Sequence, residues 1–314
     1  MSLIFASGIW WLGYLRDFSH PESLNMETSK TFFVTGATGN QGSATALNLA
    51  ENGYSVIALV RDQQSDKAKK LRHPKIQMVS GNLDDPDSYK KHLKNIDGAF
   101  AVFTFTHGIK REINHGKSFV QAAKENQVPF ILYSSVIGAD ANTGIPHWES
   151  KNEIEQYLKS SGIPYTILRP AFFFQNFLIS DVLKRIKKGA LVMPFKKEKV
   201  IQFINTDDVG KLCAHILMNK DKFIGRTFSL AADEMEMQIA AKQFSEVLGK
   251  PVKYSQLPGF LTRIFMGKDL YTMFNYMNTH DVSYVENIQD LKSAYPFLTS
   301  LNAWISANRK LFAS

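Results

Sequence analysis

Two side chains that can donate protons or bind hydroxyl groups stand four residues apart in the chain, His147 and Lys151. This spacing places both on one face of a helix, so both can point at the same ligand. Imidazole titrates near neutral pH and can act as a general acid. The structural alternative is that His147, just after Pro146, begins a helix and bonds the local backbone. Ser134 and Ser135 end an apolar run, where a hydroxyl can bond a ligand carbonyl or simply mark the end of a strand.

A glycine-rich turn, TGATGNQG at residues 35–42, follows the apolar run 31–34 and precedes a helix-like stretch. Gly36 allows a sharp turn, Gly39 allows the main chain to approach a pyrophosphate, and Gly42 allows the helix to pack against its strand. The free N–H groups and the positive dipole end of that helix would face the phosphates. Strand, turn and helix in this order predict a dinucleotide-binding turn. Its expected contact residues are Gly36, Thr38, Gly39, Asn40, Gln41 and Gly42.

The next apolar run, residues 54–60, ends in Arg61 and Asp62. After this strand an acid accepts hydrogen bonds from the adenosine ribose, whereas an arginine binds a 2′-phosphate. Because Arg61 comes first, we expect NADP(H) to be preferred over NAD(H). Asp62 argues for the opposite preference, since its distance from the glycines suits a ribose-binding acid.

The pattern of strands and helices along residues 29–170 is regular. Strands are expected at residues 55–60, 76–79, 99–105, 130–135 and 165–169, and helices at residues 44–52, 63–72, 84–95, 112–126 and 148–161. This order predicts an α/β protein with a doubly wound parallel sheet, a Rossmann fold, whose ligands bind beyond the carboxyl ends of the strands. The further candidate site residues that follow strands are Asn82, Leu83, Thr104, Phe105, Ser134, Ser135, Phe172 and Asn176. Phe172, Phe173 and Phe174 are expected either to stack near the nicotinamide ring or to fill the interface between lobes.

A less regular pattern after Pro170 predicts a smaller, mainly C-terminal α+β lobe over residues 171–314, with segments near 200–220 returning to the Rossmann core. We expect a strand at Gly225–Leu230 and a helix at Ile239–Leu248. The stretch Phe260–Met277 is rich in aromatic residues and methionine, which suits either a core helix or an adaptable wall for an apolar ligand or partner.

Composition limits the function further. The 314 residues are 44% hydrophobic and 21% charged, as expected for a cytoplasmic α/β protein. The single cysteine, Cys213, lies in an apolar helical pattern and is expected to be buried packing. The histidines show no metal-ligand spacing, so no metal is expected. The net charge is +8, but acids interrupt the basic clusters and no nucleic-acid-binding motif accompanies them, so we do not expect nucleic acid as a partner.

The N-terminal extension, residues 1–28, precedes the predicted Rossmann unit. Its apolar stretch, Leu3–Leu15, is too short to span a bilayer and lacks the features of a signal peptide. One hypothesis is that translation starts at Met26 and the extension is disordered or non-native. The other is a weak interfacial anchor in which Trp10 and Trp11 lie at headgroup depth.

The chain resembles the NmrA-like family, atypical members of the short-chain dehydrogenase/reductase superfamily, over residues 29–304. The resemblance lies in the runs GATGNQG, GNLDD, YSSV, SGIPYTILRPAFFFQN and IQFINTDDVGKLCAHIL. It implies an NAD(P)-binding Rossmann fold. It also implies one of two activities, because the family is similar both to NADPH-dependent quinone or enone reductases and to regulators that bind NADP without known turnover.

The resemblance also suggests catalytic roles. Typical members of the superfamily carry a tyrosine where this chain has His147, and a lysine at the position of Lys151. In those proteins the lysine holds the nicotinamide ribose and the tyrosine gives the proton. By this comparison Lys151, His147 and Ser135 are the catalytic candidates, with His147 as substitute proton donor. The two resulting hypotheses are a reductase of an apolar conjugated molecule and a redox sensor that regulates a protein partner.

Overall fold

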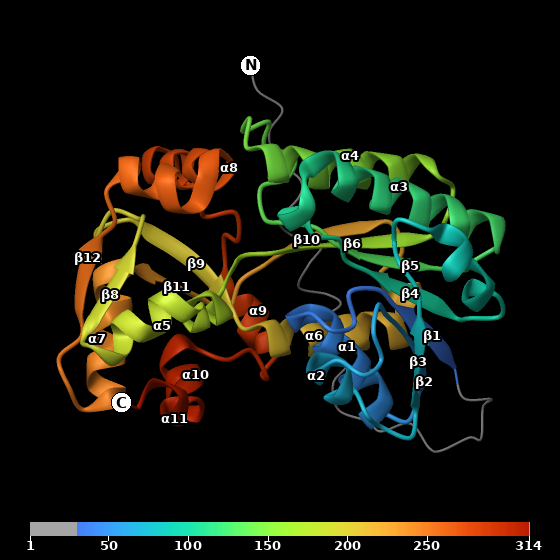
Figure 1. Ribbon diagram of the computed structural model, residues 1–314, viewed down its shortest axis with the longest axis horizontal. Helices are drawn as coiled ribbons and strands as arrows, with labels where there is room; N and C mark the ends of the chain where they lie inside the picture. The colour runs from blue at the N-terminus through green and yellow to red at the C-terminus, as the bar shows by residue number, and fades with distance from the viewer. Residues whose placement is uncertain (1–29, 314) are drawn as a thin grey trace.

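A seven-stranded, all-parallel sheet forms the centre of the larger lobe in the computed structural model, which describes residues 30–313 (Figure 1). The strand order is β10-β6-β5-β4-β1-β2-β3. The strands are β1 (Thr31–Val34), β2 (Ser55–Val60), β3 (Ile76–Ser80), β4 (Gly98–Ala101), β5 (Ile131–Ser134), β6 (Tyr165–Pro170) and β10 (Arg226–Leu230). The strand order reverses between β1 and β4, which creates a crevice at their carboxyl ends. The predicted doubly wound fold is confirmed, whereas the predictions for residues 1–28 lie outside the described residues.

Helices cover both faces of this sheet (Figure 1). One face packs against α1 (Asn40–Glu51) and α6 (Thr206–Met218), and the other against α3 (Ile109–Glu125) and α4 (Pro146–Ser160). Side chains alternate along β1, so that Phe32 joins the α1 and α6 side while Phe33 joins the α3 and α4 side. The contact between α1 and α6 is very close, because a Cβ at Gly210 would lie 2.3 Å from the Cβ of Ala44. Glycine at this position therefore lets α6, which comes late in the chain, close over the glycine-turn helix.

The smaller lobe contains two short sheets around an aromatic core. Their orders are β11-β9-β7 and β12-β8, with β7 (Phe172–Phe173), β8 (Ala190–Met193), β9 (Val200–Ile204), β11 (Asp233–Glu236) and β12 (Lys253–Gln256). The helices are α5 (Ser180–Lys187), α7 (Met237–Leu248), α8 (Gly259–Thr279), α10 (Leu301–Ala307) and α11 (Arg309–Phe312). The intervening helix α9 (Ile288–Ala294) packs instead with α6 in the core of the larger lobe. Phe174, Phe177 and Phe203 pack around Trp304 at the centre of this lobe.

Two predicted helices are much shorter than expected. The stretch 63–72 forms only α2 (Asp66–Lys69), because Pro74 disfavours helical backbone in the residue before it and the chain must turn into β3. The stretch 84–95 forms two 3₁₀ turns, Pro86–Ser88 and Lys90–Leu93.

Two other elements also differ from the sequence prediction. The expected strand 99–105 stops at Ala101, and a 3₁₀ turn at Phe105–His107 follows it. The helix α8 is interrupted at Gly267, whose φ of 83° is in the left-handed region. Met273, Phe274 and Met277 in the part of α8 after Gly267 are buried in the core, whereas Phe265 in the first part is 74% exposed.

Further 3₁₀ turns lie at Phe174–Leu178 and Lys220–Lys222.

Cys213 is buried in the core, and burial raises the pKa of its thiol to about 12. This agrees with a packing role. No helix within residues 30–313 combines the length and the apolarity that crossing a membrane requires.

Candidate dinucleotide site

A cleft of about 500 Å³ lies beyond the carboxyl ends of β1, β2, β3 and β4. The predicted residues that line it are Gly36, Thr38, Gly39, Asn40, Gln41, Gly42, Arg61, Asn82, Leu83 and Thr104. These residues come from four separate loops, and the parallel sheet brings the loops to one edge. The cleft is within the size range of small-molecule and cofactor sites.

The glycine turn forms the floor of the cleft at the start of α1. The N-cap residue of α1 is Gly39, so no side chain caps the helix, and Asn40, Gln41 and Gly42 of its first turn all line the cleft. A helix start without a capping side chain, with its positive dipole end facing a cleft, fits a phosphate group. Thr35 holds the turn in place, because its hydroxyl donates to Val102 O and accepts from Val102 N. The residues present therefore fit the pyrophosphate of a dinucleotide.

Two basic side chains, Arg61 and Lys67, line the end of the cleft that follows β2. Asp62 does not line the cleft, because its carboxylate accepts a hydrogen bond of 2.8 Å from Gln64 N in the loop that follows. The position of Asp62 in the sequence suggested ribose binding, but in the structure its carboxylate stabilises a local turn.

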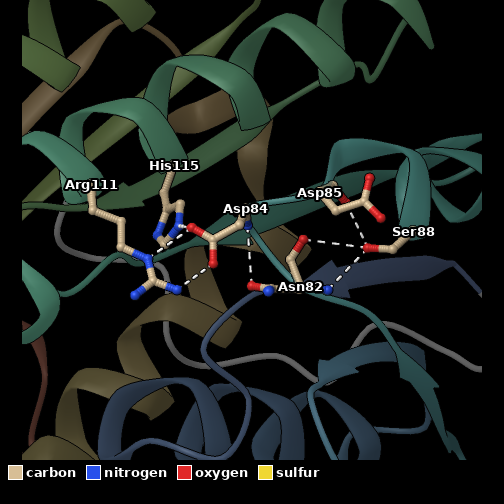
Figure 2. A network of polar contacts seen from close by, with 6 residues as sticks. All are labelled: Asn82, Asp84, Asp85, Ser88, Arg111 and His115. Carbon is tan, nitrogen blue, oxygen red and sulfur yellow. Dashed lines mark hydrogen bonds and ion pairs between the residues drawn. The ribbon is translucent and has the colours of Figure 1, made fainter.

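An ion-pair network joins the loop after β3 to α3 and borders the cleft (Figure 2). Asp84 accepts from both Arg111 and His115, with 2.8 Å between its Oδ1 and Arg111 Nε and 2.6 Å between the same oxygen and His115 Nε2. The Arg111 and His115 side chains hold the pKa of Asp84 well below its usual range, so the carboxylate stays charged and loses this pairing only at strongly acidic pH. Asp84 N donates in turn to Asn82 Oδ1. The network therefore fixes the loop that carries Asn82 and Leu83.

Lys151 lies one layer behind the cleft wall. Its Nζ donates to Phe103 O at 2.7 Å and lies 2.8 Å from Glu112 Oε1. Glu112 is fully buried, and its second oxygen accepts from Ser150 Oγ at 2.5 Å. Phe103 lines the cleft but Lys151 does not. The lysine therefore contacts the wall residue rather than the cleft itself.

A phenol beside Lys151 could in principle replace the missing tyrosine. The ring of Tyr133 lies 5.8 Å from Lys151 Nζ, and the side chain is buried. Burial and the nearby Glu112 carboxylate raise the pKa of Tyr133 well above its usual value. A raised pKa and a buried position make this phenol a poor proton donor for a ligand in the cleft.

Ser134 and Ser135 have different surroundings. Ser134 Oγ donates to Gln41 Oε1 at 2.6 Å, so it supports the glycine turn from behind. Ser135 Oγ is buried and has no hydrogen-bond partner among residues 30–313. Neither serine lines the cleft.

His147 and the predicted site residue Phe105 both lie outside the cleft lining. The two rings stack with their centroids 4.4 Å apart. The structural alternative expected His147 to begin a helix and to bond the local backbone. His147 does lie in the first turn of α4, but its ring does not bond the local backbone. Instead, its Nδ1 lies 2.6 Å from Asp269 Oδ2 on α8 of the smaller lobe.

Phe172 and Asn176 lie away from the cleft lining. Phe172 makes edge contacts with Phe195 and Phe203 in the core of the smaller lobe, which corresponds to the packing alternative. Its neighbour Phe173 lines the cleft instead. Asn176 belongs to the 3₁₀ turn Phe174–Leu178.

The cleft residues that the sequence did not suggest include Lys67, Arg111 and His115. All three come from helices that follow strands, and the sequence marks them only as charged helix positions. No group of three or more His, Cys, Asp or Glu side chains that could hold a metal ion occurs in the described part of the chain.

Comparisons with known proteins agree with this geometry. The family model described as "NmrA-like family" matches residues 28–305. The chain is 30% identical to Prestalk A differentiation protein A of Dictyostelium discoideum, over 72% of this chain and 70% of that protein. It is 29% identical to an NAD(P)H azoreductase of Xenophilus azovorans, over 70% of this chain and 75% of that protein.

Solved structures show the same fold at low sequence identity. The triphenylmethane reductase of Citrobacter sp., complexed with NADP(H), superposes with a TM-score of 0.75 at 20% identity, covering 88% of this chain and 99% of that one. NmrA, a negative transcriptional regulator in complex with NAD, gives a TM-score of 0.73 at 20% identity, covering 89% and 95%. Structural relatives thus bind NADP(H) or NAD. With the family model matched over most of its length, the chain belongs to the NmrA-like family.

Proposed function

We propose that this protein is an NADPH-dependent reductase of a quinone, an enone or a similar conjugated small molecule. One observation carries the proposal: the cleft joins a glycine turn that can hold phosphates to a wall of Phe103, Thr104, Thr106 and His107. Lys151 contacts Phe103 of this wall, and His147 stacks on Phe105 beside it. Relatives named as an azoreductase and a triphenylmethane reductase support this class of acceptor.

Each part of the site would have its own role in the reaction. When bound, the reduced nicotinamide supplies the hydride. The glycine turn orients the dinucleotide, and the wall excludes water from the acceptor. Lys151 would hold the nicotinamide ribose by exchanging its bond to Phe103 O for a ribose hydroxyl. His147, with Ser135 as a hydroxyl donor nearby in the chain, is our candidate for delivering the proton.

The preference for NADP(H) makes a first prediction. Arg61→Ala and Lys67→Ala should each lower the ratio of NADPH affinity to NADH affinity about tenfold, because each removes a charge-assisted bond to the 2′-phosphate. Titration of the protein with each dinucleotide measures the ratio. Lys70→Ala, an exposed lysine next to α2 that does not line the cleft, is the matched control. An unchanged ratio in both variants would show that the 2′-phosphate binds elsewhere or not at all.

Turnover is the second prediction. Purified protein should consume NADPH in the presence of at least one acceptor from a panel of quinones, enones and triphenylmethane dyes. The absorbance of NADPH follows the reaction, and binding of NADPH is measured in the same samples. A protein that binds NADPH and reduces no acceptor in the panel contradicts the reductase proposal.

A second candidate function is a redox sensor that regulates a protein partner. Two observations favour it: Lys151 is bound to Glu112 and Phe103 rather than lining the cleft, and the first part of α8 exposes Phe260, Ile264 and Phe265. The structural relative NmrA, a negative transcriptional regulator, lends support. A sensor must bind the oxidised and reduced dinucleotides with unequal affinity. Equal affinity for the two forms would remove its mechanism.

A further inference from the structure

A carboxylate of the smaller lobe contacts His147 at two points. Asp269 Oδ2 lies 2.6 Å from His147 Nδ1, and Asp269 Oδ1 accepts a hydrogen bond of 3.1 Å from His147 N. The His147 residue is 6% exposed, and the Asp269 side chain is 25% exposed. Nδ1 and Oδ2 are both buried, and neither atom has a hydrogen-bond partner in the described part of the chain, so the contact between them is an ion pair rather than an aligned hydrogen bond. The contact joins α8 to the first turn of α4 across the boundary between the lobes.

The position of Asp269 also completes the helix that carries His147. The N-cap residue of α4 is Ile145, whose side chain cannot accept a hydrogen bond. Asp269 supplies the missing acceptor to a backbone N–H of the first turn and places a negative charge at the positive end of the helix dipole. The break at Gly267, two residues earlier, ends the first part of α8 just before Asp269. The backbone of Asp269 is thus fixed by the second part of α8, and its carboxylate by the two contacts with His147.

This contact decides which nitrogen of the imidazole carries a proton. A carboxylate oxygen 2.6 Å from Nδ1 repels a lone pair there and favours the N–H form. In the neutral ring Nε2 then has the lone pair, and in the imidazolium Nε2 carries a proton that it can donate. Nε2 has no hydrogen-bond partner among residues 30–313.

The ring is held beside the cleft wall. His147 stacks on Phe105 with an interplanar angle of 23° and meets Trp148 edge-on. Thr104 and Thr106, on either side of Phe105, both line the cleft. Trp148 in turn packs against Tyr276 at the other end of α8. The imidazole is therefore fixed between the cleft wall and the smaller lobe.

We propose that Asp269 is a positioning residue that fixes the tautomer and the orientation of His147, so that His147 Nε2 donates the proton during reduction. This inference rests on the proposed reductase function. The acceptor gains a hydride from the reduced dinucleotide and a proton from Nε2, so it takes up two electrons and two hydrogens. The dinucleotide leaves oxidised, and the neutral imidazole regains its proton from water. Because Asp269 lies on α8, the proton donor is complete only while the smaller lobe is docked on α4.

The test uses Asp269→Asn, with Glu286→Gln, an exposed acid that follows α8 in the chain, as the control. Asparagine keeps the size of the side chain and an oxygen that can accept from His147 N. Its amide group would face Nδ1, which removes the charge and favours the opposite tautomer. Nitrogen NMR of the protein without dinucleotide, with the His147 signals assigned from His147→Gln, should show Nδ1–H in the unmodified protein and a changed tautomer in Asp269→Asn only.

Kinetics with an acceptor that the unmodified protein reduces gives the second measurement. Asp269→Asn should lower kcat at least ~10-fold, within the range of general acid catalysis, with little change in KM or NADPH affinity. In a His147→Gln background the same substitution should have no further effect on kcat, because the two residues act as one unit. Glu286→Gln should behave like the unmodified protein in every assay.

The outcomes that overturn the inference are distinct. An unchanged tautomer or an unchanged kcat in Asp269→Asn overturns the role of Asp269 and leaves the reductase proposal intact. An equal loss of kcat with and without His147 also overturns it, because Asp269 then acts through the fold. If the unmodified protein binds NADPH and reduces no acceptor, the reductase proposal and the proton transfer fall together.

Discussion

Replacement of Gly42 by alanine should lower the affinity for NADPH ~100-fold. A Cβ at this position would lie 2.3 Å from Gly36 O, 2.6 Å from Gly36 C and 2.9 Å from Thr35 O. All three atoms belong to the backbone of the glycine turn, so the turn or the start of α1 must move. The loss corresponds to two charge-assisted hydrogen bonds to the pyrophosphate of about 1.5 kcal/mol each.

Titration of NADPH with each variant checks this prediction, and circular dichroism with thermal unfolding shows whether the variant is folded. Gly259→Ala is the control, because a Cβ there would meet only the Tyr271 ring, at 3.4 Å. A folded Gly42→Ala protein with unchanged NADPH affinity would show that the turn does not hold the phosphates.

The Lys151→Met substitution should destabilise the protein by about 3–5 kcal/mol, because it leaves the fully buried carboxylate of Glu112 without its charged partner. The double substitution Glu112→Gln with Lys151→Met should recover most of this stability, because no uncompensated charge remains. Urea unfolding of the single and double variants measures both changes. Equal stability of the single variant and the unmodified protein would show that the pair contributes nothing.

The ion pair between Lys151 and Glu112 also affects how the activity of Lys151 variants must be interpreted. A Lys151 variant that reduces no acceptor can have lost either its ribose contact or its folded structure. The double variant separates the two explanations, because it restores neutrality in the core without restoring the lysine. Loss of turnover in a stable double variant would identify Lys151 as part of the dinucleotide site.

The glycine turn and the succession of strands and helices could be predicted because each depends on residues close together in sequence. Gly36, Gly39 and Gly42 are set by the local path of the backbone, and apolar runs mark the buried strands. Phe172 and Phe173 show the limit of such reasoning. They are adjacent in sequence, but alternation along a strand turns one into the core of the smaller lobe and the other towards the cleft.

Partners that come from distant elements could not be predicted. Asp269 lies 122 residues after His147, and Glu112 lies 38 residues before Ser150. Nothing in the local pattern of either acid distinguishes it from a solvated helix position. The short 3₁₀ turns in place of the helix 84–95 had a local signal in Pro86, but the amphipathic spacing of Tyr89 and Leu93 favoured a helix.

The position of β10 at the edge of the large sheet affects how the chain folds during synthesis. β10 pairs with β6, although α5, β8, β9 and α6 are made between them, and α6 covers one face of the sheet beside α1. Until residue 230 has left the ribosome, the first six strands of this sheet would have an open edge and a partly uncovered apolar face. The larger lobe cannot be completed before much of the smaller one exists. The sheet of the larger lobe therefore gains its last strand only after β7, α5, β8 and β9 of the smaller lobe have been synthesised.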